Sequence, residues 1–210
     1  DAAMELRKNP QAKGMDTGWA TLDQFYRPAK GLLTIVTGIP NHGKSTFIDV
    51  LCHNLSLKHD WRITFASFET KPIQMHILNL CHIHLGKPTF SFIPGCATDE
   101  EMEQARKILE GRFYFIMPDE HELNMPDILN YVDDDIREHG IDGFVLDPFT
   151  ELDQTRAKNM RQDEQIEVIL RDLQGFTSRR DIHSWLIAHP TKGSETYRNG
   201  RPTMYSIAGA

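Results

Sequence analysis

Residues 32–47 read LLTIVTGIPNHGKSTF: a short apolar run, a turn with two glycines, and the start of a helical pattern. The turn, residues 38–45, fits the pattern GxxxxGK(S/T) between a strand and a helix, which is the setting that the pattern requires. Glycines let such a backbone wrap around phosphate oxygens, and the N–H groups that open the helix supply positive potential. The stretch therefore predicts a phosphate-binding loop in a protein built from strands and helices.

The loop predicts a site for ATP and Mg²⁺. Lys44 is expected to reach the β- and γ-phosphates, and the hydroxyl of Ser45 is expected to ligate Mg²⁺. The side chain of His42 is interpreted as solvent-facing, with no chemistry of its own. The residues expected to bind the nucleotide are Gly38, Ile39, Pro40, Asn41, His42, Gly43, Lys44, Ser45 and Thr46.

The rest of the chain alternates between short apolar runs and longer helical patterns. Strands are predicted at residues 32–37, 62–68, 112–117, 143–147 and 184–189. Helices are predicted at residues 44–58, 72–85, 99–110, 126–139 and 161–180, with a capping box from Thr98 to Glu101, Pro126 in a first turn and Gly140 as a stop. Because most strands are apolar throughout, we expect an α/β fold whose mostly parallel sheet carries helices on both faces.

Composition and charge narrow the class of protein. A chain of 210 residues with 40% hydrophobic and 25% charged residues suits one large domain, expected at residues 14–210 behind an arm at residues 1–13. The net charge of −7 argues against a protein that coats nucleic acid with its whole surface, so any phosphate-backbone contact must be local. No apolar run approaches the roughly 18 residues of a membrane span, and the three cysteines, Cys52, Cys81 and Cys96, suit reduced thiols.

Two acidic residues at predicted strand ends could complete the site. Asp147 ends the strand at residues 143–147 and is expected to accept hydrogen bonds from a Mg²⁺-bound water. Glu69 lies at the end of the strand at residues 62–68, where ligands bind in open α/β sheets, so it could orient or deprotonate the attacking water. The alternative is that Glu69 or Thr70 only caps the following helix.

Five stretches together resemble RecA-type ATPases, and more specifically the DnaB-like replicative helicases of the Twinkle and bacteriophage primase-helicase branch. They are GMDTGWATLD (14–23), LLTIVTGIPNHGKSTF (32–47), FASFET (65–70), GFVLDPFTELD (143–153) and WLIAHPTK (185–192). The resemblance implies a RecA-like fold in which Glu69 is the catalytic glutamate and Asp147 the Walker B aspartate. It also implies that His189 senses the γ-phosphate, on a strand inserted between the strand of the loop and the strand of Asp147.

In this family, the loops after the Walker B strand and after the sensor strand face the central channel of a ring. The resemblance implies single-stranded DNA contacts by Arg156, Lys158, Arg161, Lys192, Arg198 and Arg201. Lysine and arginine would neutralise DNA phosphates there. The alternative for each residue is an exposed loop charge with no ligand. The family also has further strands and an arginine finger, which we expect beyond residue 210.

The resulting hypothesis is a Mg²⁺-dependent ATPase motor of a replicative DNA helicase. We expect a homo-oligomeric ring, hexameric or heptameric, that moves on single-stranded DNA, with a primase domain or protein as a further partner and no membrane contact. The expected compartment is the cytoplasm of a prokaryote or phage-infected host, with the mitochondrial matrix as the alternative. Two alternative functions stay open: a RecA-type ATPase of the clock or recombination kind, and an ATP-dependent assembly module with little hydrolysis.

Overall fold

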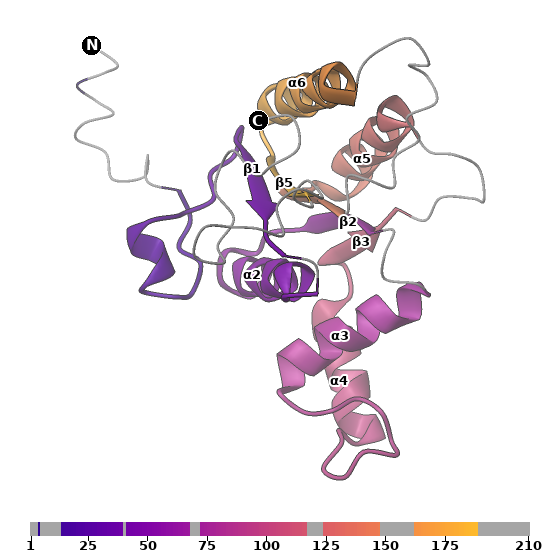
Figure 1. Ribbon diagram of the computed structural model, residues 1–210. Coiled ribbons are helices and arrows are strands. Elements are labelled where there is room, and N and C mark those ends of the chain that lie inside the picture. Colours follow the sequence, from indigo (N-terminus) through magenta and orange to yellow (C-terminus); the bar gives the residue numbers. More distant parts are fainter. Residues whose placement is uncertain are drawn as a thin grey trace.

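The protein is built on one sheet of five parallel strands (Figure 1). The computed structural model describes Met4 and residues 14–39, 41–67, 72–116, 124–147 and 162–188. The strands are β1 (Leu33–Thr37), β2 (Ile63–Ser67), β3 (Phe113–Phe115), β4 (Gly143–Asp147) and β5 (His183–Ala188). Their order across the sheet is β1-β5-β4-β2-β3, so β5 lies between β1 and β4, as the resemblance implied.

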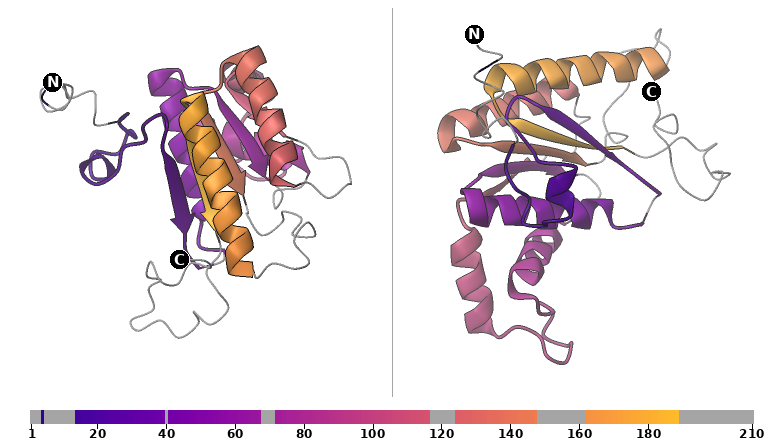
Figure 2. Two further views of the ribbon diagram at one scale, coloured as in Figure 1. Left: turned by 90° about the horizontal axis from the view of Figure 1, so that it is seen from above. Right: turned by 90° about the vertical axis from the view of Figure 1, so that its left-hand side faces the viewer.

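Helices cover both faces of this sheet, which confirms the predicted α/β architecture. They are α2 (Lys44–His59), α3 (Ile73–Leu85), α4 (Asp99–Leu109), α5 (Met125–His139) and α6 (Gln162–Arg180), with a 3-10 turn η2 at Leu22–Gln24. Helices α5 and α6 lie on one face and α2 on the other, while α3 and α4 extend from the sheet beside α2 (Figures 1 and 2). Of the helices in the described residues, none combines the length and the apolar composition needed to cross a bilayer.

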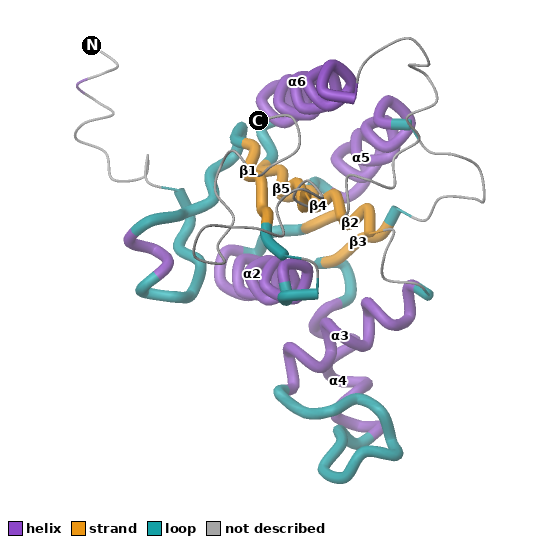
Figure 3. The backbone as a smooth tube through the Cα atoms, in the orientation of Figure 1, coloured by secondary structure: helices purple, strands orange, loops and turns teal. Residues whose placement is uncertain are grey.

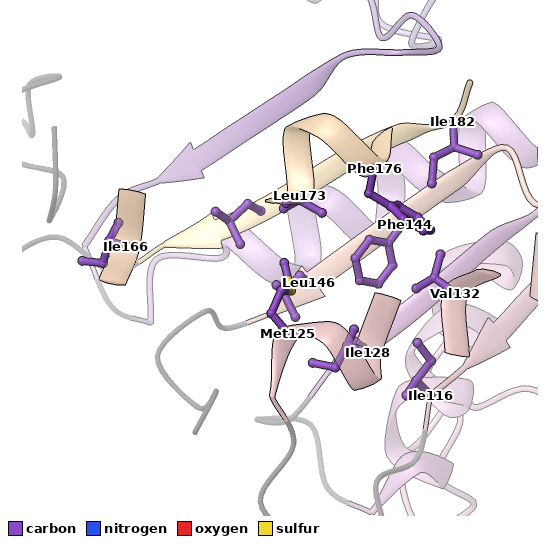
Figure 4. Close-up of a cluster of buried hydrophobic side chains, with 12 residues drawn as sticks. Ile116, Met125, Ile128, Val132, Phe144, Leu146, Ile166, Leu173, Phe176 and Ile182 are labelled. Carbon is purple, nitrogen blue, oxygen red and sulfur yellow. The ribbon is translucent and has the colours of Figure 1, made fainter. Parts of the chain in front are cut away.

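Each face of the sheet has its own apolar core. Phe144 and Leu146 of β4 pack with α5 and α6 through Ile128, Leu173 and other side chains (Figure 4). On the other face, α2 packs its buried side chains against Trp185 and its neighbours. Helices bury the sheet on both faces. Successive side chains of a strand therefore all face an apolar core, which explains the continuous apolar runs in the sequence.

Capping residues and a glycine stop mark helix ends where the sequence predicted them. Thr98 and Glu101 form the predicted capping box at the start of α4. Gly140 ends α5 in the left-handed conformation, with φ 68°, and its N–H donates to the carbonyl of Ile136. The predicted strand at residues 112–117 is too long, because β3 is an edge strand that pairs with β2 through only three residue pairs. Figure 3 shows the described loops between these elements in teal.

Candidate nucleotide-binding site

The phosphate-binding loop connects the end of β1 to the start of α2. Asn41 and Gly43 both have left-handed backbones, with φ of 60° and 78°, and these turn the chain into the helix. Gly43 is the N-cap residue of α2 and has no side chain to cap the helix. The first hydrogen bond of the helix runs from the N–H of Phe47 to the carbonyl of Gly43, at 2.9 Å. The preceding N–H groups of the first turn have no acceptor within the helix. They therefore present the positive end of α2 to an anion.

Lys44 folds back over this loop. Its Nζ donates to the carbonyl oxygens of Gly38 at 3.0 Å and Ile39 at 3.2 Å. This geometry holds the ammonium group at the mouth of the loop, where a phosphate oxygen could replace a carbonyl as acceptor. Ser45 follows it at the start of α2, and the side chain of His42 is exposed, as predicted.

The carboxyl ends of β1, β5, β4 and β2 lie level with one another beside the loop. Thr37 of β1 pairs with Ala188 of β5, and Ser67 of β2 pairs with Asp147 of β4. Asp147 is only 3% exposed, so its carboxylate lies at the buried edge of the sheet and not in bulk water. The strand ends therefore form one platform, as expected for a ligand site in an open parallel sheet.

The two other proposed catalytic residues follow directly from this platform. Glu69 comes two residues after Ser67, and His189 comes one residue after Ala188. Both lie outside the described residues, as does Pro40 of the loop. Pro72 occupies the N-cap position of α3, and the capping alternative for Glu69 or Thr70 concerns residues outside the described part of the chain.

The described residues fit a magnesium nucleotide. The hydroxyl of Thr37, immediately before the loop, is buried and has no hydrogen-bond partner within the described part of the chain. A hydroxyl, the carboxylate of Asp147 and the hydroxyl of Ser45 are the oxygen ligands that Mg²⁺ and its bound waters favour. Bound Mg²⁺ would neutralise phosphate charge, and Lys44 and the amides of the loop would hold the phosphate oxygens.

Six basic residues are predicted to contact DNA. They are Arg156, Lys158, Arg161, Lys192, Arg198 and Arg201, and all lie outside the described residues. The strands that lead into the two loops, β4 and β5, are neighbours in the sheet. Asp147 and Ala188, the last described residues before these two loops, therefore end neighbouring strands at the carboxyl edge of the sheet.

Polar contacts between α2 and α3 were not predicted from the sequence. The carboxylate of Asp49 contacts Nε2 of His76 at 2.9 Å, and both side chains are buried. One turn further along α2, Nε2 of His53 lies 3.1 Å from Nδ1 of His84. Burial, and then the charge of His84, lower the pKa of His53. The spacing 49/53 puts two polar side chains on one face of α2, whereas 76 and 84 are eight residues apart, a little over two turns of α3.

The segment before β1 is fastened to α2. The N–H and hydroxyl of Thr17 donate to Oδ1 of Asp23 at 2.6 and 2.8 Å, and these bonds lower the pKa of Asp23. Asn54 of α2 donates to the carbonyl of Thr17 at 3.0 Å. The ring of Trp19 stacks on Phe47, with centroids 5.5 Å apart and an interplanar angle of 14°. The motif GMDTGWATLD therefore ties the start of the domain to the helix of the phosphate-binding loop.

Comparisons with known proteins agree with this geometry. The family model for the DnaB-like helicase C-terminal domain matches residues 14–208. A Twinkle homolog protein, chloroplastic/mitochondrial, from Arabidopsis thaliana is 34% identical over 202 residues. The match covers 94% of this chain and 28% of that protein.

Two solved structures share the fold at a low sequence identity. The ATPase domain of G40P superposes with a TM-score of 0.77 at 16% identity, over 100% of this chain and 75% of that chain. A DnaB-like replicative helicase, described with its interactions with primase, gives a TM-score of 0.77 at 16% identity, over 98% of this chain and 51% of that chain. The five-stranded sheet is thus the RecA-like ATPase fold. By its sequence, its fold and its phosphate-binding loop, the chain belongs to the DnaB-like helicase C-terminal domain family.

Proposed function

We propose that this chain is the ATP-hydrolysing motor domain of a ring-shaped replicative DNA helicase that moves along single-stranded DNA. One observation carries the proposal: the phosphate-binding loop lies level with the buried carboxylate of Asp147 in a chain of the DnaB-like family. A triphosphate held by the loop would direct its γ-phosphate toward the strand ends. Carboxylates at the strand ends would then lie near the γ-phosphate, where hydrolysis requires a group that binds Mg²⁺ and a group that activates water.

Each proposed catalytic residue has a separate task. Lys44 and the amides of the loop stabilise the negative charge that develops on the phosphate oxygens. Ser45 and Asp147 would hold Mg²⁺, which would neutralise charge on the phosphates. Glu69 orients the attacking water and accepts its proton, and His189 reads the state of the γ-phosphate.

The same strands support a proposal for coupling to DNA. His189 follows β5 and the Walker B residue ends β4, and the two loops with the basic residues begin just after these positions. A change at the γ-phosphate would therefore reach Lys192, three residues after His189, and Arg156, nine residues after Asp147, along the backbone. A ring of six or seven copies would surround the DNA, and a primase domain or protein would act beside it.

The wider protein and its compartment are also proposals. The chain spans 28% of the Arabidopsis homolog, so most of a protein of that kind lies outside this domain. The name of the homolog, chloroplastic/mitochondrial, supports the organellar alternative over the prokaryotic cytoplasm.

The proposal is tested by replacing the carboxylate that activates water. The substitution Glu69→Gln keeps the size and polarity of the side chain but removes the base, so ATP binding should persist while turnover falls about 10²-fold or more. Turnover is measured on the full chain with and without single-stranded DNA, and binding by calorimetry. Glu110→Gln, on an exposed residue at the end of α4, is the matched control. Undiminished turnover in Glu69→Gln would remove Glu69 from the catalytic role.

The two alternative functions are separated by the same assays. A RecA-type ATPase that is not a helicase would hydrolyse ATP but would not separate the strands of a fluorescent forked duplex. An assembly module would bind ATP and form oligomers with little turnover, whether DNA is present or not. ATP hydrolysis that DNA stimulates, together with strand separation, supports the motor.

A further inference from the structure

The proposed function assigns residues to the phosphates of the nucleotide but none to its base. An aromatic pair lies close to the place where the base must go. Phe47 is three residues after Lys44, so its position is roughly 5 Å along the helix axis from that lysine. Its ring stacks on Trp19 and is 39% exposed, so part of the stacked pair is accessible to a ligand.

The order of the strands decides the direction of the bound nucleotide. Asp147 ends β4, and the strand leading to Glu69 is β2, and both lie on the same side of the loop in the order β1-β5-β4-β2-β3. The γ-phosphate must face these acids, so the nucleoside end of the triphosphate must point the opposite way, past β1. Figure 1 shows the segment at residues 14–31, in indigo, on that side of β1 and α2. Trp19 belongs to this segment.

Polar contacts hold Trp19 in place. The segment is tied to α2 through Asn54, which donates to the carbonyl of Thr17, and through an ion pair between Lys58 and Asp16. The backbone N–H of Trp19 donates to the hydroxyl of Thr17 at 3.2 Å. These bonds hold the segment in addition to the stacking of Trp19 on Phe47. A surface fixed before the ligand arrives costs less entropy on binding.

We infer that Trp19 and Phe47 form a shelf on which the base of the bound nucleoside triphosphate stacks, with a preference for purines. The inference rests on the proposed nucleotide binding and deepens it. Every base has a flat π-face that an aromatic side chain can accept, and the larger purine face makes the larger contact. The motif GMDTGWATLD gains a role by this inference, since its Thr17, Asp23 and Gly18 shape the turn that presents Trp19.

Calorimetry with two ligands separates the base from the phosphates. The full chain is titrated with magnesium ATP and with magnesium tripolyphosphate, which has the same phosphate tail and no base. The variants Trp19→Leu and Phe47→Leu keep an apolar side chain but each remove one ring of the stacked pair. Each should weaken ATP binding about tenfold and leave tripolyphosphate binding unchanged. Trp19→Phe should retain ATP binding, and Trp19→Leu should reduce the preference for ATP over CTP.

Control variants make each outcome decisive. Phe25→Leu changes an aromatic residue of the same segment that is 85% exposed, and should bind both ligands like the wild type. Thermal unfolding midpoints check that all variants are folded. Unchanged ATP affinity in Trp19→Leu and Phe47→Leu, with binding lost in Lys44→Ala, would overturn the shelf and leave the proposed function intact. Equal losses for ATP and tripolyphosphate would mean that the pair only supports the loop, and no binding by the wild type would overturn both proposals.

Discussion

Neutral His183 should make the stability of the fold depend on pH in a defined range. His183 begins β5 and is only 1% exposed. Its Nδ1 lies 2.7 Å from the carbonyl oxygen of Ala29, so that nitrogen must carry the proton and donate. Its Nε2 lies 3.0 Å from the hydroxyl of Thr34 and 3.2 Å from that of Tyr26, so it accepts as a neutral ring. Burial lowers the pKa of His183 to about 4.

The size and the sign of the effect follow from this pKa. An unfolded histidine has a pKa of about 6.5, so the difference of about 2.5 pH units corresponds to about 3 kcal/mol. Between pH 6.5 and 4 the unfolded chain binds a proton that folded His183 does not. The stabilising contribution is therefore complete above pH 6.5 and is lost progressively as the pH falls through this range.

Urea unfolding measures this contribution directly. The free energy of unfolding is determined from pH 7.5 to 4.5 for the wild type, for His183→Gln, and for His42→Gln as an exposed control. Glutamine can still donate and accept hydrogen bonds but does not titrate. The wild type should lose about 2–3 kcal/mol more than His183→Gln over this range, and His42→Gln should follow the wild type. Coincident pH profiles for the wild type and His183→Gln would refute the buried neutral state.

Two further substitutions test the packing around the site. A Cβ atom at Gly143 would lie 2.8 Å from Cζ3 of Trp185 and 3.3 Å from Cγ1 of Ile63. Gly143→Ala should therefore lower the free energy of unfolding by about 1–3 kcal/mol and lower the thermal midpoint measurably. An unchanged midpoint would contradict the tight contact. His76→Leu leaves the buried carboxylate of Asp49 without its partner and should cost about 3 kcal/mol in chemical denaturation. Adding Asp49→Leu should recover much of that loss, whereas strictly additive losses would show that the two residues do not act as a pair.

Short stretches of sequence were enough to predict the elements of the fold and the phosphate-binding loop. The loop is continuous in the chain, so its glycines, Lys44 and Ser45 are brought together by one turn between a strand and a helix. The helix ends at Thr98 and Gly140 were predictable for the same reason, because a cap or a left-handed stop involves residues within one turn. The position of Asp147 at a strand end also follows from the apolar run before it.

Tertiary structure alone decided which distant residues meet. The pairs Asp49 with His76 and Trp19 with Phe47 join residues 27 or more positions apart, and they depend on how α2 packs against α3 and against the segment before β1. The length of β3 also depends on its place in the sheet. It pairs with β2 through only three residue pairs, and its own residues do not specify that limit. The spacing of apolar residues and the capping residues predict local structure, because they depend only on residues close together in the chain. Contacts across the fold are selected by the packing of whole faces, and it is this packing that aligns the strand ends beside the loop.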